Sequence, residues 1–337
     1  MEFLTRGWFW MVLGGAVLTA AAGAVGTTGT SRWWLVPAVL GLVLTMTGIL
    51  LLFRPRFRFA ELGTAQLRLV IGAGLVSGII AFFVASFIEG RLEPRMHVPF
   101  AVDLWLAGAI EETCKLAVPV LLLIFSRRRF GDPRAGVLMV LISAAVFGLG
   151  EGIQYITSGT SANSSLLLTL VRPLTEISHP LWTAVAAGAI WLAAHRSGRV
   201  MTWVGLAGWL VSSLLHSVHD GLFSAGQQGT QNRTTDLDLP LTEVAAVAVA
   251  TNIINLVAAV ITFLIARHVL RELVPPTAIA QNPPHWRPRL VLWGVPRATR
   301  TQWEAEQPVV VDNSGPSGSH RTAGHQHKRH RSERHAD

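Results

Sequence analysis

Several ionisable residues stand at helical spacing inside apolar stretches of this 337-residue chain. Glu111 and Lys115 are four residues apart, as are His216 and Asp220, so each pair shares one face of a helix. Two further candidates lie in the apolar runs between these pairs, Glu151 and His179. Carboxylates and imidazoles together suit hydrolysis, because a carboxylate can take a proton from water while histidines or a metal support the attack. These residue types therefore predict a hydrolytic site.

The runs that carry these residues are long enough to cross a membrane. Half of the residues are apolar and only 14% are charged. Windows of about 20 residues predict eight spans, at 7–26, 33–53, 69–88, 104–126, 135–157, 172–194, 200–222 and 245–266. We therefore expect an all-α, polytopic integral membrane protein of about eight transmembrane helices, with the active site inside the helix bundle. A single cysteine excludes an internal disulfide, and no CxxC or HExxH spacing indicates a familiar zinc cluster.

The distribution of arginine predicts the orientation of the chain. Arginines cluster between spans two and three, between four and five, and after span six, whereas the connection at 158–171 has no charge. The positive-inside rule then places both termini in the cytoplasm. Arginine far outnumbers lysine, which is typical of a GC-rich bacterial genome, so we expect a bacterial plasma membrane.

The same composition divides the chain into four parts. Residues 1–103 hold three N-terminal transmembrane helices, and 104–222 hold the catalytic core of helices four to seven. Residues 223–271 hold an external loop, at 223–244, and the eighth helix. The segment 272–337 is rich in proline, histidine and arginine, and we expect a disordered basic tail that is attracted to anionic lipid. We expect no nucleic-acid partner.

The polar residues of the core also agree in depth. An ionisable group at the bilayer centre costs about 2.5 to 3.5 kcal/mol on insertion scales and usually marks a functional site. Counted from the external ends at about 1.5 Å per residue, four candidates lie about 9 to 10 Å deep: Glu111, Glu151, His179 and His216. Pro180 should kink its helix beside His179. The sequence therefore predicts that four helices bring these side chains to one layer.

Three motifs occur in order on successive spans: "EETCK" at 111–115 fits EExxK, "FGLGE" at 147–151 fits FxxxE, and "HSVHD" at 216–220 fits HxxxD. Over about residues 104–222 the chain resembles the PrsW family of intramembrane proteases, distant relatives of the CAAX prenyl proteases and of bacteriocin-processing proteins. The resemblance implies an endopeptidase that cuts a membrane-anchored protein near the external face. A regulatory substrate similar to an anti-sigma factor would fit that implication.

The resemblance also implies roles for individual residues. Its catalytic set is Glu111, Glu112, Glu151, His179, His216 and Asp220. Glu111 would be the activating base, Glu112 its partner, and Asp220 an orienting group. The family is described as metallopeptidases, whereas CAAX enzymes look like glutamate and histidine proteases that activate water directly. If a metal such as zinc is used, three residues form the expected ligand set, Glu151, His179 and His216.

Other interpretations stay open at this level. Membrane carboxylates and histidines also form proton relays, so a proton-coupled transporter is one alternative, and a non-catalytic scaffold is another. Glu112 with Lys115, and Arg172 with Glu176, could be structural ion pairs. His219 could equally take no part in the site or contact the site residues from behind. Asn252 and Asn255 are expected to join helices. Serine and aspartyl intramembrane proteases are disfavoured, because the chain lacks GxSG and has glutamate where GxGD requires aspartate.

Overall fold

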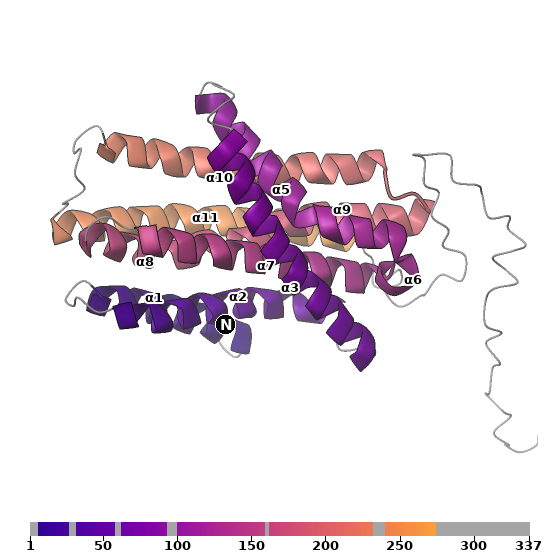
Figure 1. The fold of residues 1–337 in the computed structure, drawn as a ribbon, viewed down its shortest axis with the longest axis horizontal. Coiled ribbons are helices and arrows are strands. Elements are labelled where there is room, and N and C mark those ends of the chain that lie inside the picture. The colour runs from indigo at the N-terminus through magenta and orange to yellow at the C-terminus, as the bar shows by residue number, and fades with distance from the viewer. Residues whose placement is uncertain are drawn as a thin grey trace, which may run out of the picture. The chain divides into compact units, whose positions relative to one another are not determined.

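The computed structural model describes residues 6–26, 32–57, 62–92, 100–158, 162–231 and 240–273. These residues form helices and no strand (Figure 1). In chain order the helices are α1 (Gly7–Gly26), η2 (Arg32–Trp34), α2 (Leu35–Phe57), α3 (Thr64–Phe87), the π-helical η4 (Ile88–Leu92), α5 (Phe100–Phe125), α6 (Arg127–Phe130), α7 (Pro133–Ser158), α8 (Ala162–Glu176), α9 (Ser178–Ser197), α10 (Trp203–Gln231) and α11 (Leu241–Leu273).

The predicted all-α, multi-pass membrane architecture is confirmed. Six helical stretches in the described part of the chain are long and apolar enough to cross a membrane: Gly7–Gly26, Arg32–Phe53, Thr64–Arg91, Pro133–Ser158, Ala162–Ser197 and Leu241–His268. The remaining two predicted spans correspond to α5 and α10, which have 26 and 29 residues. They are less apolar because α5 contains four charged residues, and serines and histidines lower the hydropathy of α10. These two helices carry much of the candidate site.

Two predicted connections are shorter than expected. The connection predicted at 158–171 is wrong for most of its length, because α8 begins at Ala162. Leucines at helical spacing follow the serine-rich start of this segment, and α8 packs on α1, where Thr169 lies against Gly23. The external loop predicted at 223–244 is also partly wrong, because α10 continues to Gln231 and α11 begins at Leu241. The predicted tail, beyond the end of α11 at Leu273, lies outside the described residues.

The sixth predicted span is broken into α8 and α9 at Ile177. Pro180 has no N–H for the carbonyl of Glu176, four residues earlier, and its ring crowds that carbonyl. The helix is therefore interrupted at Ile177, two residues before His179.

The interior of the bundle is formed mainly by α7 and α9. α9 packs against α7, α10 and α11, and α7 also packs against α3 and α8 (Figure 1). The side chains of α9 are buried almost throughout, from Ser178 to Ala194. In contrast, α3 and α11 expose large apolar side chains such as Phe83, Phe87 and Ile253, as lipid-facing helices do. α9 is thereby kept away from the lipid-facing surface of the bundle.

Gly136 of α7 allows the close approach of α9. A Cβ atom there would overlap the indole of Trp191, which is fully buried and donates to the carbonyl of Phe130 over 2.9 Å. We expect Gly136→Ala to lower the free energy of unfolding by about 1 to 3 kcal/mol, the usual cost of overpacking. Unfolding in detergent measures this change in stability. The control is Gly72→Ala on α3, an exposed position where a Cβ atom meets nothing within 4 Å. Equal stabilities of the two variants would contradict this packing account.

Candidate active site

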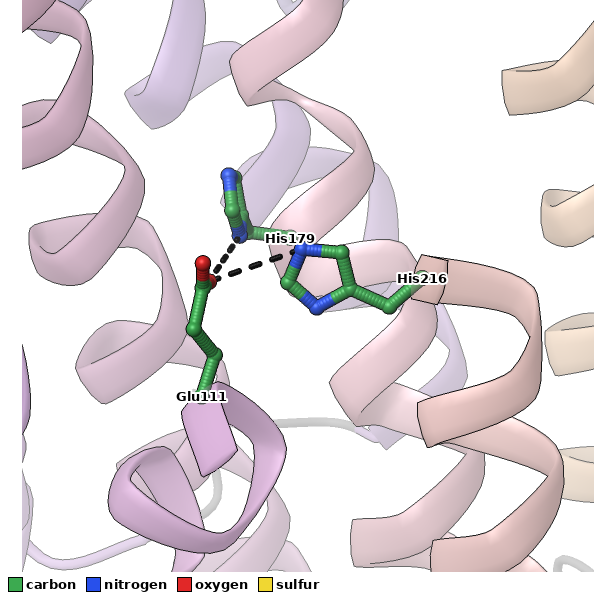
Figure 2. Close-up of side chains that lie close together, drawn as sticks. All are labelled: Glu111, His179 and His216. Atoms are coloured by element: carbon green, nitrogen blue, oxygen red, sulfur yellow. Dashed lines mark ion pairs between the residues drawn. The ribbon is translucent and has the colours of Figure 1, made fainter. Parts of the chain in front are cut away.

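Three helices bring ionisable side chains together at Glu111. Figure 2 shows Glu111 of α5 facing His179 of α9 and His216 of α10. Glu111 Oε2 lies 3.5 Å from Nε2 of His216, 3.8 Å from Nδ1 of His179 and 3.0 Å from Nζ of Lys115. All four residues are buried. The first glutamate of the EExxK motif therefore faces both histidines that the sequence singled out.

Glu112 points to a different set of partners, because consecutive residues of a helix are about 100° apart. Its Oε1 lies 2.9 Å from Nζ of Lys115 and 3.1 Å from Nδ1 of His216. Its Oε2 accepts hydrogen bonds from Ser212 over 2.7 Å and from Thr183 over 2.8 Å. The predicted ion pair of Glu112 with Lys115 is present. Contact with Glu112 fixes one nitrogen of His216 and leaves the other facing Glu111.

The two nitrogens of His179 face opposite surroundings. Nδ1 lies 2.7 Å from Nζ of Lys115. Nε2 lies 2.9 Å from Oε2 of Glu151 and 3.1 Å from Oε2 of Glu176. A carboxylate only accepts hydrogen bonds, so these two carboxylates favour the tautomer that carries its proton on Nε2. Nδ1 then holds the lone pair that faces Glu111.

Arg172 of α8 connects the two carboxylates that lie behind His179. Its guanidinium lies 2.8 Å from Oε1 of Glu151 and also pairs with Glu176. The same group stacks over the ring of Tyr155, 3.6 Å from the ring centroid. The predicted pair of Arg172 and Glu176 is present, and both side chains are buried. The sequence placed Glu176 three residues before His179 and did not include it in the site.

Asp220 lies at the more accessible side of the cluster, with a side chain 30% exposed. Its Oδ2 is 3.4 Å from Nε2 of His216, and its Oδ1 is 3.4 Å from Nδ1 of His219. Nε2 of His219 lies 3.1 Å from Oδ1 of Asn255, whose amide donates to Thr175 over 2.8 Å. Asn255 therefore joins α11 to α8 and α10, as expected. His219 lies between Asn255 and Asp220 and can support the latter.

An aromatic side chain that the sequence did not single out packs between the histidines. Trp182 stacks on His216 with ring centroids 4.2 Å apart and planes 20° apart. Its centroid lies 5.2 Å from that of His179, and Phe147 flanks His179 on another side at 5.5 Å. Trp182 follows His179 by three residues, a spacing that could have indicated the contact. These rings restrict the rotation of both imidazoles.

The cluster holds more carboxylates than fixed cations. With both histidines neutral, two fixed cations, Lys115 and Arg172, face five carboxylates. These carboxylates belong to Glu111, Glu112, Glu151, Glu176 and Asp220. If all five carboxylates are ionised, they exceed the fixed cations by three charges in a mostly buried cluster, and protons held by the cluster or a bound cation would offset this excess. A divalent cation would offset most of this charge.

The structure indicates which atoms would bind such a cation. Donor atoms of Glu111, His179 and His216 all lie within 4.8 Å of one another. A second such group is formed by Glu151, Glu176 and His179. The ligand set expected from the sequence was Glu151, His179 and His216, and it is neither of these groups. Glu151 contacts Nε2 of His179, on the opposite side of the ring from Glu111 and His216.

The first group fits zinc. One carboxylate and two imidazoles form a common catalytic zinc set, and two ligands about 2.0 to 2.1 Å from a tetrahedral zinc lie about 3.3 Å apart. Glu111 Oε2 is 3.5 and 3.8 Å from the two histidine nitrogens. Glu151 and Glu176 at the far nitrogen of His179 resemble the carboxylates that orient zinc-binding histidines. Both carboxylates of the second group already pair with Arg172.

Buried glutamates and histidines at this spacing, inside a multi-pass helical bundle, suit an intramembrane peptidase. The chain matches the family model described as "PrsW family intramembrane metalloprotease" over residues 63–251, more than half of its length. It therefore belongs to the PrsW family, as the three motifs predicted. Comparison with curated proteins and with solved structures gives no match.

Gly148, in the FxxxE motif, allows His179 to reach its position. A Cβ atom at residue 148 would lie 2.9 Å from Cδ2 of His179 and 3.2 Å from the carbonyl oxygen of Glu176. We expect Gly148→Ala to shift the imidazole and to lower the cleavage rate by about 10- to 100-fold, because small displacements of reacting groups are costly. Initial rates in proteoliposomes measure this effect, with Gly72→Ala as the control. An unchanged rate would show that His179 tolerates displacement.

Proposed function

We propose that this chain cuts a membrane-anchored protein near the external face of a bacterial plasma membrane, with both of its own termini in the cytoplasm. Family membership supports the peptidase chemistry. The arginine-rich connections support the orientation, and the depth of the polar layer supports cleavage in the outer half of the bilayer. A regulatory substrate, similar to an anti-sigma factor, is the proposed target.

The observation that carries this proposal is the convergence of Glu111 Oε2 with Nδ1 of His179 and Nε2 of His216 (Figure 2). These three residues would hold a zinc ion. When bound, zinc lowers the pKa of a water molecule and polarises a carbonyl group.

The surrounding residues prepare this group for hydrolysis. Glu112 holds Nδ1 of His216 at 3.1 Å, so that Nε2 points to the reacting centre. Glu151 and Glu176 hold Nε2 of His179 in the same way. Asp220 is the most exposed carboxylate of the cluster and lies 3.4 Å from His216 Nε2, so it is placed to accept a proton from the attacking water. If water attacks without a metal, Glu111 takes this role.

The proposal is tested by the proteins that the enzyme cuts. In the native host, the membrane and shed proteomes are compared between cells with the wild-type chain and cells with Glu111→Gln at equal abundance. We expect a single-pass protein whose external fragment is released only by the wild type. Identical proteomes under envelope stress, with a folded variant, would overturn the proposal in favour of a proton-coupled transporter or a scaffold.

A further inference from the structure

Lys115 is a completely buried cation whose ammonium contacts three groups of the site. Nζ lies 3.0 Å from Oε2 of Glu111, 2.9 Å from Oε1 of Glu112 and 2.7 Å from Nδ1 of His179. The contacts to Glu111 and His179 involve the same two atoms that are proposed to hold zinc. The ammonium therefore lies where a metal ion would bind.

The contact with His179 cannot coexist with a metal bond. A neutral imidazole has one nitrogen that carries hydrogen and one that carries a single lone pair in the ring plane. The ammonium of Lys115 can only donate to Nδ1, and the carboxylates near Nε2 can only accept, so both sides favour the hydrogen on Nε2 and the lone pair on Nδ1. That lone pair either accepts a hydrogen bond from Lys115 or coordinates a metal. The Lys115 ammonium and a metal ion would also repel each other if both contacted Glu111 and His179.

Lys115 keeps other partners if it leaves His179. Glu112 is held by Ser212 and Thr183 and can retain the ammonium at Oε1. The ring of Phe147 lies under Nζ, with its centroid 4.3 Å away, and provides a cation–π contact. Lys115 would therefore keep a carboxylate and an aromatic ring as partners after releasing Nδ1 of His179.

We propose that Lys115 is a placeholder cation: it occupies Glu111 and His179 in the metal-free protein, and zinc binding displaces it toward Glu112. Lys115 thereby lowers the affinity of the site for zinc and stabilises the metal-free fold. The inference rests on the zinc set of the proposed function and is independent of which substrate is cut.

Zinc affinity of the purified full-length protein tests this role. The wild type, Lys115→Met and Lys115→Gln are stripped of metal in detergent and titrated with zinc against a chromophoric chelator. We expect both variants to bind zinc about tenfold or more tightly, because a competing charge is gone. Their metal-free forms should unfold at a lower temperature than the wild type, and zinc should raise that temperature by more. Lys115→Gln retains a donor for Glu112 in case the methionine variant does not fold.

Two controls locate the effect. His179→Ala should abolish the wild-type affinity, which shows that the titration reads this site. Arg196→Met removes a positive charge from the exposed end of α9 and should leave the affinity unchanged. Unchanged or weaker zinc binding by both Lys115 variants would overturn the inference, and so would a wild type that binds no zinc. Cleavage by the wild type, measured separately, shows whether peptidase function survives that outcome.

Discussion

Replacement of Glu111 by glutamine is expected to lower the rate of substrate cleavage by about 10²- to 10⁴-fold, the usual contribution of a group that activates water. Glutamine has nearly the shape of glutamate and carries no negative charge, so it is a poor metal ligand and cannot take a proton. Glu111 lies within 3.8 Å of both histidines, and the loss applies whether water is activated by zinc or by the carboxylate itself.

The measurement is the initial rate in proteoliposomes with the substrate found by proteome comparison. Glu243→Gln, at an exposed position in the first turn of α11, is the matched control and should keep the wild-type rate. Thermal unfolding of both variants shows whether the fold is retained. A folded Glu111→Gln enzyme with a rate close to that of the wild type would exclude Glu111 from the chemistry.

Arg172→Met is expected to have the largest effect on stability. Arg172 is buried and pairs with Glu151 and Glu176, so methionine would leave the buried carboxylate of Glu176 and the partly buried one of Glu151 without their cation. Removing one partner from a buried ion pair costs about 3 to 5 kcal/mol. We therefore expect a decrease of this size in the free energy of unfolding, measured in detergent micelles.

Two further variants distinguish loss of charge pairing from loss of packing. Arg196→Met replaces an exposed arginine and should change stability by less than about 0.5 kcal/mol. The double variant Arg172→Met with Glu176→Gln removes one of the two uncompensated charges and should recover part of the loss. Stability of Arg172→Met equal to that of the wild type would show that the Arg172 pairs contribute nothing to the fold.

The sequence by itself determined the membrane class, the approximate spans and the helices that carry the site. Long apolar runs have no stable place in water, and ionisable residues within them are costly enough to indicate function. Helical spacing predicted that Glu111 shares a face with Lys115, and Pro180 predicted the break in the sixth span. The connection at 158–171 was overestimated because a lack of charge does not distinguish a loop from a helix that packs on α1.

Only the tertiary structure decided which atoms meet. A helix can rotate about its axis until it packs, so the sequence could not tell which glutamate of the EExxK motif faces both histidines. Contacts with distant residues, such as Ser212 with Glu112, fix that rotation and direct Glu111 toward His179 and His216. The same packing places Glu151 at the far nitrogen of His179 and brings Arg172 behind it. These arrangements depend on the lateral order of helices, which long-range packing determines and local spacing does not.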